Sequence, residues 1–161
     1  MVSKLNLTTI NTTIENLSTG DLTVGVMGLG YVGLPLSVEI ARSGIRVLGF
    51  DVNPEVVDSI MSGRSHVEDI TDDELREVVT TGHLVAITDM ERLSECDAIS
   101  KSDTTTHSKT QDPDVSYVIA AAQAVAKSLK LGQLVVLEST TYPGTTDENL
   151  REILETRSGL I

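Results

Sequence analysis

Hydrophobic and polar positions follow two different periods along most of the chain. Short apolar runs, typical of buried parallel strands, lie at 22–27, 46–51, 84–88, 97–99 and 133–138. Between them, apolar residues recur at the three-to-four-residue spacing of helices, which predicts helices over 34–42, 54–61, 72–81, a short stretch ending at 93, 114–129 and 147–156. This alternation predicts an α/β fold, a doubly wound Rossmann-like parallel sheet with helices on both faces and its ligand at the carboxyl ends of the strands.

The first segment stands apart from this alternation. Residues 1–21 precede the first strand, and their apolar side chains fall at helical spacing: Leu7, Ile10, Ile14 and Leu17. We expect a short amphipathic helix lying on the domain or on a second subunit, with a frayed tail as the alternative. The expected organisation is therefore an N-terminal extension, 1–21, and one domain, 22–161.

A glycine-rich turn follows the first predicted strand. Gly28 allows a tight turn, Gly30 lets the backbone approach a pyrophosphate, and Gly33 lets the next helix pack closely. Free N–H groups at that helix N-terminus face the phosphates. The predicted cofactor loop consists of Gly28, Leu29, Gly30, Tyr31, Val32 and Gly33.

An acidic residue closes the second predicted strand. The carboxylate of Asp51 can accept hydrogen bonds from both ribose hydroxyls, which favours NAD over a cofactor with a 2′-phosphate. A strand, glycine motif, helix, strand and acid within one ~30-residue unit together predict a dinucleotide site. Two alternatives stay open: glycines that serve packing alone, or a site for another adenine-containing ligand such as S-adenosylmethionine.

Charge and composition limit the classes of partner that the chain is expected to bind. The 161 residues carry 12 Lys+Arg against 24 Asp+Glu, a net charge of -12, which disfavours nucleic acid and acidic membranes. Phosphates are then expected to be held by backbone N–H groups and helix ends. The single cysteine and a start without an apolar signal segment lead us to expect a cytoplasmic protein. The three histidines are scattered, so no metal site is expected.

Several segments, in order, resemble the nucleotide-sugar 6-dehydrogenases, which act on UDP-glucose, UDP-N-acetylglucosamine, UDP-N-acetylmannosamine or GDP-mannose. The matching segments are 24–36, 49–53, 63–66, 113–118 and 137–146. The last of these, Glu-Ser-Thr-Thr-Tyr-Pro-Gly-Thr-Thr after Leu137, looks most like the UDP-N-acetylglucosamine branch. The resemblance implies an enzyme that oxidises a sugar C6 alcohol to a carboxylate in two steps with two NAD.

The resemblance also implies roles for individual residues. Tyr31 and Val32 would lie against the pyrophosphate, while Asp51 would take the adenosine ribose, with Asn53 of the same motif at the cofactor. Thr105 stands where the family has the threonine of a cofactor-contacting Pro-Thr-Pro loop. Thr140 matches the threonine near the nicotinamide that helps to hold a catalytic water.

One departure from the family concerns what the chain contains. The family's cysteine nucleophile, catalytic lysine and sugar-binding residues belong to segments beyond residue 161, so the chain corresponds to the N-terminal cofactor domain. Cys96 lies at the amino end of the fourth strand, opposite the ligand side, and is expected to be a buried core residue. We expect no complete oxidation by this chain alone and a UDP-sugar only in the intact enzyme, and the sequence leaves a homo-oligomer open. The alternative is a non-catalytic nucleotide-binding or oligomerisation module derived from the family.

A second departure is local. Where the family has an apolar strand and Pro-Thr-Pro, this chain has the polar segment 99–107. Burying Lys101 and Asp103 in a central strand would cost several kcal/mol unless they pair or reach solvent. The sequence therefore predicts either a fourth strand shortened to end near Ile99 or a weakened domain, with NAD affinity in doubt. Suitable codons for 102–108, read one base later, spell Pro-Thr-Pro-Pro-Leu-Thr, so a compensated pair of frameshifts is a hypothesis that the coding DNA tests.

Overall fold

The structure, a computed structural model, describes residues 19, 21–102, 116–138 and 150–159. Its strands are β1 (Thr23–Met27), β2 (Arg46–Phe50), β3 (Leu84–Ile87), β4 (Ala98–Ser102) and β5 (Leu134–Glu138). Its helices are α2 (Gly33–Arg42), α3 (Pro54–Met61), α4 (Asp72–Thr80), the 3₁₀ helix η1 (Met90–Glu95), α5 (Ser116–Ser128) and α6 (Arg151–Ser158). The predicted extension 1–21 lies almost wholly outside the described residues.

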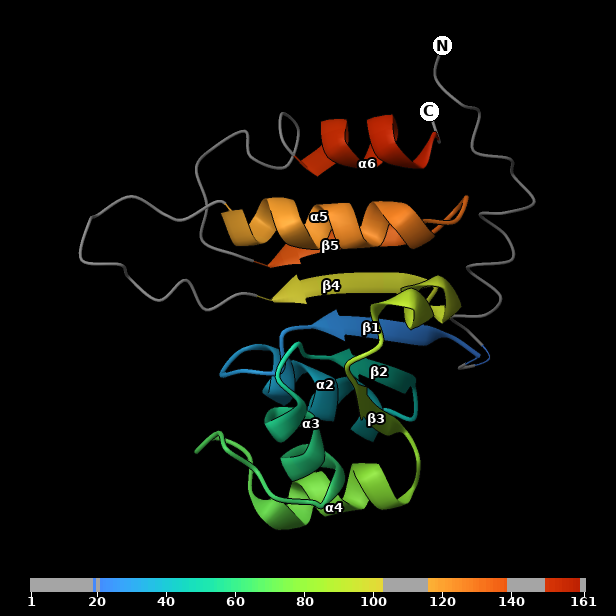
Figure 1. The fold of residues 1–161 in the computed structure, drawn as a ribbon. Helices are drawn as coiled ribbons and strands as arrows, with labels where there is room; N and C mark the ends of the chain where they lie inside the picture. Colours follow the sequence, from blue (N-terminus) through green and yellow to red (C-terminus); the bar gives the residue numbers. More distant parts are fainter. Residues whose placement is uncertain (1–18, 20, 103–115, 139–149, 160–161) are drawn as a thin grey trace.

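The five strands form one parallel sheet in the order β3-β2-β1-β4-β5 (Figure 1). The chain winds outward from β1 to β3, then returns to the other side of β1 to add β4 and β5. This reversal makes the sheet doubly wound and creates a crevice between β1 and β4 at their carboxyl ends. The predicted fold class is confirmed.

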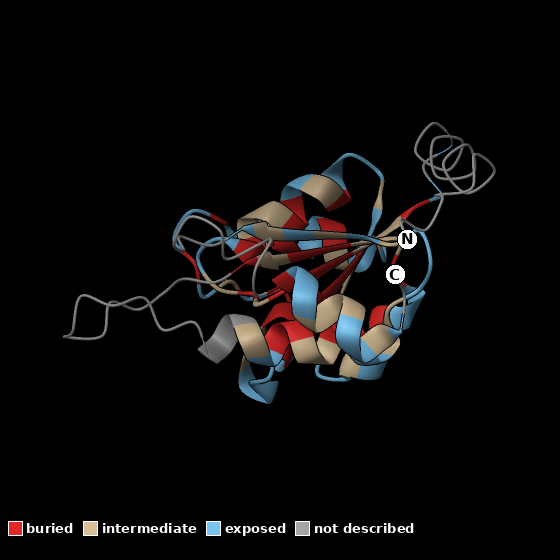
Figure 2. Cartoon of the chain, turned by 90° about the horizontal axis from the view of Figure 1, so that it is seen from above, coloured by how far each residue is buried: buried red, intermediate tan, exposed pale blue. Residues whose placement is uncertain are grey.

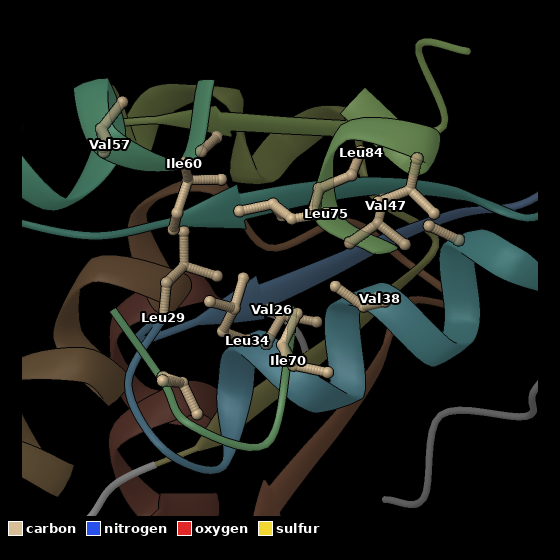
Figure 3. Packing of buried hydrophobic residues seen from close by; sticks show 14 residues of the cluster. Val26, Leu29, Leu34, Val38, Val47, Val57, Ile60, Ile70, Leu75 and Leu84 are labelled. Atoms are coloured by element: carbon tan, nitrogen blue, oxygen red, sulfur yellow. The ribbon is translucent and has the colours of Figure 1, made fainter. Parts of the chain in front are cut away.

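Alternate side chains of the central strands enter two separate cores. On β2, Val47 faces a cluster with α2, α3 and α4, while Leu48 and Phe50 face the opposite cluster with η1 and α5. Figure 2 shows the resulting layers, with buried strands between helices on either side. Figure 3 shows the first cluster, in which Ile60 of α3 and Leu75 of α4 close over the strands. Burial on both faces explains why these strands are almost continuously apolar.

The fourth strand is not shortened, contrary to one of the two alternatives from the sequence. β4 continues through Ser100 and Lys101 to Ser102, paired with β1 on one side and β5 on the other. Two ladders of backbone hydrogen bonds hold a central strand in place whatever its side chains. These polar residues are expected to lower the stability of the domain, because the Ser100 and Ser102 hydroxyls are buried with no hydrogen-bond partner among the described residues.

Local capping signals fix two helix starts. The Asn53 side chain accepts from the N–H of Glu55 at 3.0 Å and Pro54 occupies the first turn of α3, as its sequence predicts. Thr71 and Glu74 form a capping box at the start of α4, the helix that the sequence pattern predicts over 72–81. The hydrogen bonds from Thr71 lower the pKa of the Glu74 carboxyl. No helix within the described ranges is long and apolar enough to cross a membrane.

Candidate functional site

A cavity of about 430 Å³ lies at the carboxyl ends of β1, β2 and β4. The glycine loop after β1 and Asp51 after β2 form one side, Lys101 and Ser102 of β4 another, and Met90 of η1 with alanines of α5 close it. Its size is in the range of small-molecule sites. It also occupies the position at which open α/β sheets bind ligands, as the sequence predicts.

The glycines at the two ends of the loop are required by close backbone packing. Gly28 has a φ of +88°, and a Cβ there would lie 2.5 Å from the carbonyl oxygen of Ser102. A Cβ at Gly33 would overlap the carbonyl oxygen of Gly28. The first and last glycines of the motif therefore hold the turn tightly against the start of α2.

Backbone donors gather where the loop meets α2. The N–H of Gly28 donates to the carbonyl of Phe50 at 2.8 Å, and that of Leu29 donates to the carboxylate of Asp51 at 2.9 Å. The next four N–H groups donate to no acceptor within the described residues: those of Gly30, Tyr31, Val32 and Gly33. Unpaired N–H groups at a helix N-terminus, with the positive end of the helix dipole, form an anion-binding site.

The Asp51 carboxylate links this loop to the end of β2. One oxygen accepts from Leu29 as above, and the other accepts from the N–H of Asn53 at 2.9 Å. These bonds fix the carboxylate at the cavity wall. Each oxygen keeps a further lone pair, because a carboxylate oxygen accepts two hydrogen bonds. The side chain can therefore brace the loop and still accept from a pair of neighbouring hydroxyls.

The other predicted loop residues have different environments. Leu29 is fully buried, and its side chain packs where a Cβ at Gly49 would stand, so that its contribution is to the core. Val32 lines the cavity. The Tyr31 side chain is 63% exposed and lies outside the cavity lining. Its backbone N–H, rather than its ring, belongs to the donor cluster.

Three further residues were predicted at the site, and the structure describes one of them, Asn53. The side chain of Asn53 caps α3 and is absent from the cavity lining. Thr105 and Thr140 lie outside the described residues. Their expected roles at the cofactor and the catalytic water stay predictions.

Sequence reasoning did not assign Lys101 to the site. Its polar character was treated as a burden on a buried strand, yet its side chain is half-buried and lines the cavity. The signal that could have found it is its register. Lys101 pairs with Met27, the residue before the glycine loop, at the carboxyl end of the neighbouring strand.

Cys96 is a core residue, as predicted. It is fully buried in the cluster with Phe50 and Ile99, and a Cβ at Gly25 would lie 2.8 Å from its sulfur. Burial raises the pKa of the thiol to about 12. Such a thiol stays protonated near neutral pH and makes a poor nucleophile.

Comparison with known proteins identifies the domain. The family model for the NAD-binding domain of the UDP-glucose/GDP-mannose dehydrogenase family matches residues 22–160. The UDP-N-acetyl-D-mannosamine dehydrogenase of Pyrococcus horikoshii is 39% identical over 132 residues, covering 81% of this chain and 31% of that protein. The UDP-N-acetyl-D-glucosamine 6-dehydrogenase of Salmonella typhi is 37% identical over 131 residues, covering 81% and 30%. These two identities do not separate the N-acetylglucosamine branch from the N-acetylmannosamine branch.

The solved structures agree. The NDP-N-acetyl-D-galactosaminuronic acid dehydrogenase of Methanosarcina mazei Go1 superposes with a TM-score of 0.81 at 36% identity, covering 86% of this chain and 32% of that one. The chain thus spans about a third of the length of these relatives. The chain belongs to the UDP-glucose/GDP-mannose dehydrogenase family and contains its NAD-binding domain.

Proposed function

We propose that the chain binds NAD with its diphosphate against the N–H groups of residues 30–33 and its adenosine ribose on Asp51. The observation that carries this proposal is the donor cluster, which faces a cavity walled by a fixed carboxylate. Donors suit a diphosphate, and an acceptor suits a pair of hydroxyls. The same carboxylate would repel a 2′-phosphate, so NAD is preferred over NADP.

The relatives support a proposal for the reaction of the complete protein. We propose that the chain is the cofactor-binding part of an enzyme that oxidises the C6 alcohol of a nucleotide sugar, with a UDP-N-acetylhexosamine favoured by the names of the matching enzymes. Bound NAD supplies the hydride acceptor. The part of the described residues is to anchor the adenosine and diphosphate so that the nicotinamide end has a fixed position. Thr140 is proposed beside that end.

A cytoplasmic location is part of the same proposal, supported by the need for a cytoplasmic pool of NAD and nucleotide sugar and by the single cysteine. Self-association is also proposed only at the level of the complete protein.

Calorimetric titration of NAD into the purified chain tests the proposal. We expect saturable binding that weakens roughly ten- to hundredfold in Asp51→Ala, since charged hydrogen bonds to two hydroxyls are lost. Asp58→Ala, on the exposed side of α3, removes the same charge and serves as the matched control. Because Asp51 also holds the loop, Asp51→Asn, which keeps an acceptor for Leu29, separates ribose binding from loop support.

Three results would contradict the proposal. No heat signal at millimolar NAD would favour a non-catalytic module, an alternative that the two unpartnered serine hydroxyls of β4 keep open. Equal affinity of Asp51→Ala and Asp58→Ala would place the ribose elsewhere. Binding of S-adenosylmethionine without NAD would assign the cavity to another ligand.

A further inference from the structure

The carboxyl end of β4 places a cation inside the cofactor cavity. Lys101 lies beside Met27 in the β1–β4 ladder, so its side chain stands next to the strand that leads into the glycine loop. It points to the α5 side of the sheet, the side of Ile99, and lines the same cavity as Gly28 and Gly30.

The ammonium group reaches the turn itself. A Cβ at Gly28 would lie 3.7 Å from Nζ of Lys101, which puts the charge directly over the first glycine of the loop. A Cβ at Gly28 would also lie 2.5 Å from the carbonyl oxygen of Ser102, so β4 and the loop are in close contact there. Lys101 is thus close to the start of the donor cluster.

The positive charge of Lys101 suits the cavity to an anionic ligand. The chain has a net charge of -12, and Lys101 is the one cationic residue among the described residues that line the cavity, opposite Asp51. A diphosphate bridge carries two negative charges, whereas a helix N-terminus contributes only about half a positive charge. A lysine ammonium supplies the remaining attraction and three hydrogen-bond donors.

A second polar group stands at the same rim. Ser102 is 3% exposed and lines the cavity, and within the part of the chain that the structure describes its hydroxyl has no hydrogen-bond partner. A buried hydroxyl without a partner is uncommon in proteins, and a phosphate oxygen would satisfy it.

We propose that Lys101 binds the diphosphate of the dinucleotide, with the Ser102 hydroxyl as a second donor, so that β4 and the glycine loop hold it from two sides. The inference rests on NAD binding in this cavity. It replaces the expectation that backbone groups alone would hold the phosphates of so acidic a chain.

NAD titrations of matched variants test the role of Lys101. Lys101→Met, which keeps the length of the side chain without its charge, is expected to raise the Kd for NAD about tenfold. Lys101→Arg should retain most of the affinity. Lys130→Met is the control, because Lys130 is exposed after α5 and its loss changes net charge equally. Thermal melts verify that each variant is folded, with Lys101→Gln as the replacement if Lys101→Met is not.

Salt dependence provides a second readout. Raising NaCl from about 50 to about 300 mM should weaken NAD binding to the unmodified chain more than to Lys101→Met, because one screened charge pair is missing in the variant. Ser102→Ala should give a smaller loss, about threefold.

The outcomes separate this inference from the proposed function. If Lys101→Met and Lys130→Met bind NAD equally while Asp51→Ala binds weakly, the inference is wrong and the cofactor site stands. If the unmodified chain does not bind NAD, both are wrong. A tenfold loss in Lys101→Met with unchanged salt dependence would also overturn it, because a direct charge contact predicts both.

Discussion

The two halves of the sheet differ in how completely their side chains agree with the fold. In the β1–β3 half, both faces of the strands are covered, and Leu84 of the outer strand β3 is fully buried. In the β4–β5 half, Leu134 of the outer strand is 59% exposed, and the hydroxyls of two buried serines of β4 have no partner in the described ranges. The cofactor cavity lies between these halves.

The two halves therefore contribute differently to the site. The tight turn, the unpaired N–H groups and the acid all come from the first half, which is packed firmly enough to hold them in place. The second half supplies the facing wall, where the sequence departs most from the family. We infer that the first half determines which ligand the cavity accepts and supplies most of the affinity, and that the second half adds to that affinity.

The largest effect is expected at the contact between the loop and α2. Gly33→Ala places a Cβ on the carbonyl oxygen of Gly28, so the loop must open and the donor cluster must disperse. We expect NAD affinity to fall more than about 100-fold, or over 2.7 kcal/mol. Calorimetry measures this loss.

Gly44→Ala is the control for Gly33→Ala. A Cβ at Gly44 meets nothing within 4 Å, although its φ of +90° is strained for alanine. We expect a stability cost of about 1 kcal/mol and unchanged NAD affinity. NAD binding to Gly33→Ala with unchanged affinity would show that the loop geometry does not govern binding.

The next effect compares the two outer strands. Leu84→Ala removes a fully buried side chain and should lower the free energy of unfolding by about 2–5 kcal/mol. Leu134→Ala, on the half-open strand, should lower it by less than about 1 kcal/mol. Urea denaturation measures both. Equal losses would mean that the halves are equally well packed in solution.

A smaller and opposite pair of effects involves buried serines. Ser100→Ala removes a hydroxyl that has no partner and should raise stability by up to about 1 kcal/mol. Ser37→Ala removes a hydroxyl that donates to the carbonyl of Gly33 at 2.7 Å and should lower stability by about 1 kcal/mol. The same sign of change in both variants, measured by thermal unfolding, would contradict the claim that the Ser100 hydroxyl destabilises β4.

The last effect is confined to alkaline pH and concerns Cys96, which directly precedes the second half. Burial raises the pKa of the Cys96 thiol from its ordinary value of 9.0 to about 12, so the folded chain keeps a proton that the unfolded chain releases. The buried, protonated thiol therefore makes its full contribution to the free energy of unfolding below pH ~9, and this contribution is lost as the pH rises towards ~12. Cys96→Ala should therefore show a shallower decline over this range. Identical declines in urea titrations would place the thiol in contact with solvent.

The fold could be predicted from the sequence because the apolar runs of the strands and the helical spacing of the helices were both regular, and two helix starts carry capping residues. The Asn53-Pro54 pair and the capping box at Thr71 each marked a helix start that the structure contains. Helix α6 begins at Arg151, whereas the pattern predicted a range of 147–156, of which 147–149 lies outside the described residues. Capping signals of this kind involve residues only a few positions apart, so they can be recognised from the sequence alone.

The site was harder to predict, because it depends on contacts between distant residues. The hydrogen bond from Leu29 to Asp51 joins residues 22 apart in the sequence. No sequence pattern indicates that the same carboxylate both holds the loop and lines the cavity. The fourth strand was underestimated because side-chain polarity was weighed without the two neighbouring ladders. The Asn53 side chain caps α3, and its expected contact with the cofactor stays a prediction.

The most direct measurement is the amide NMR spectrum of the chain with and without NAD. The account predicts that the N–H signals of Gly30, Tyr31, Val32 and Gly33 shift on saturation, while control signals from the turn at Gly82 do not move. NAD binding that leaves all four loop signals unshifted would contradict the claim that these groups hold the diphosphate.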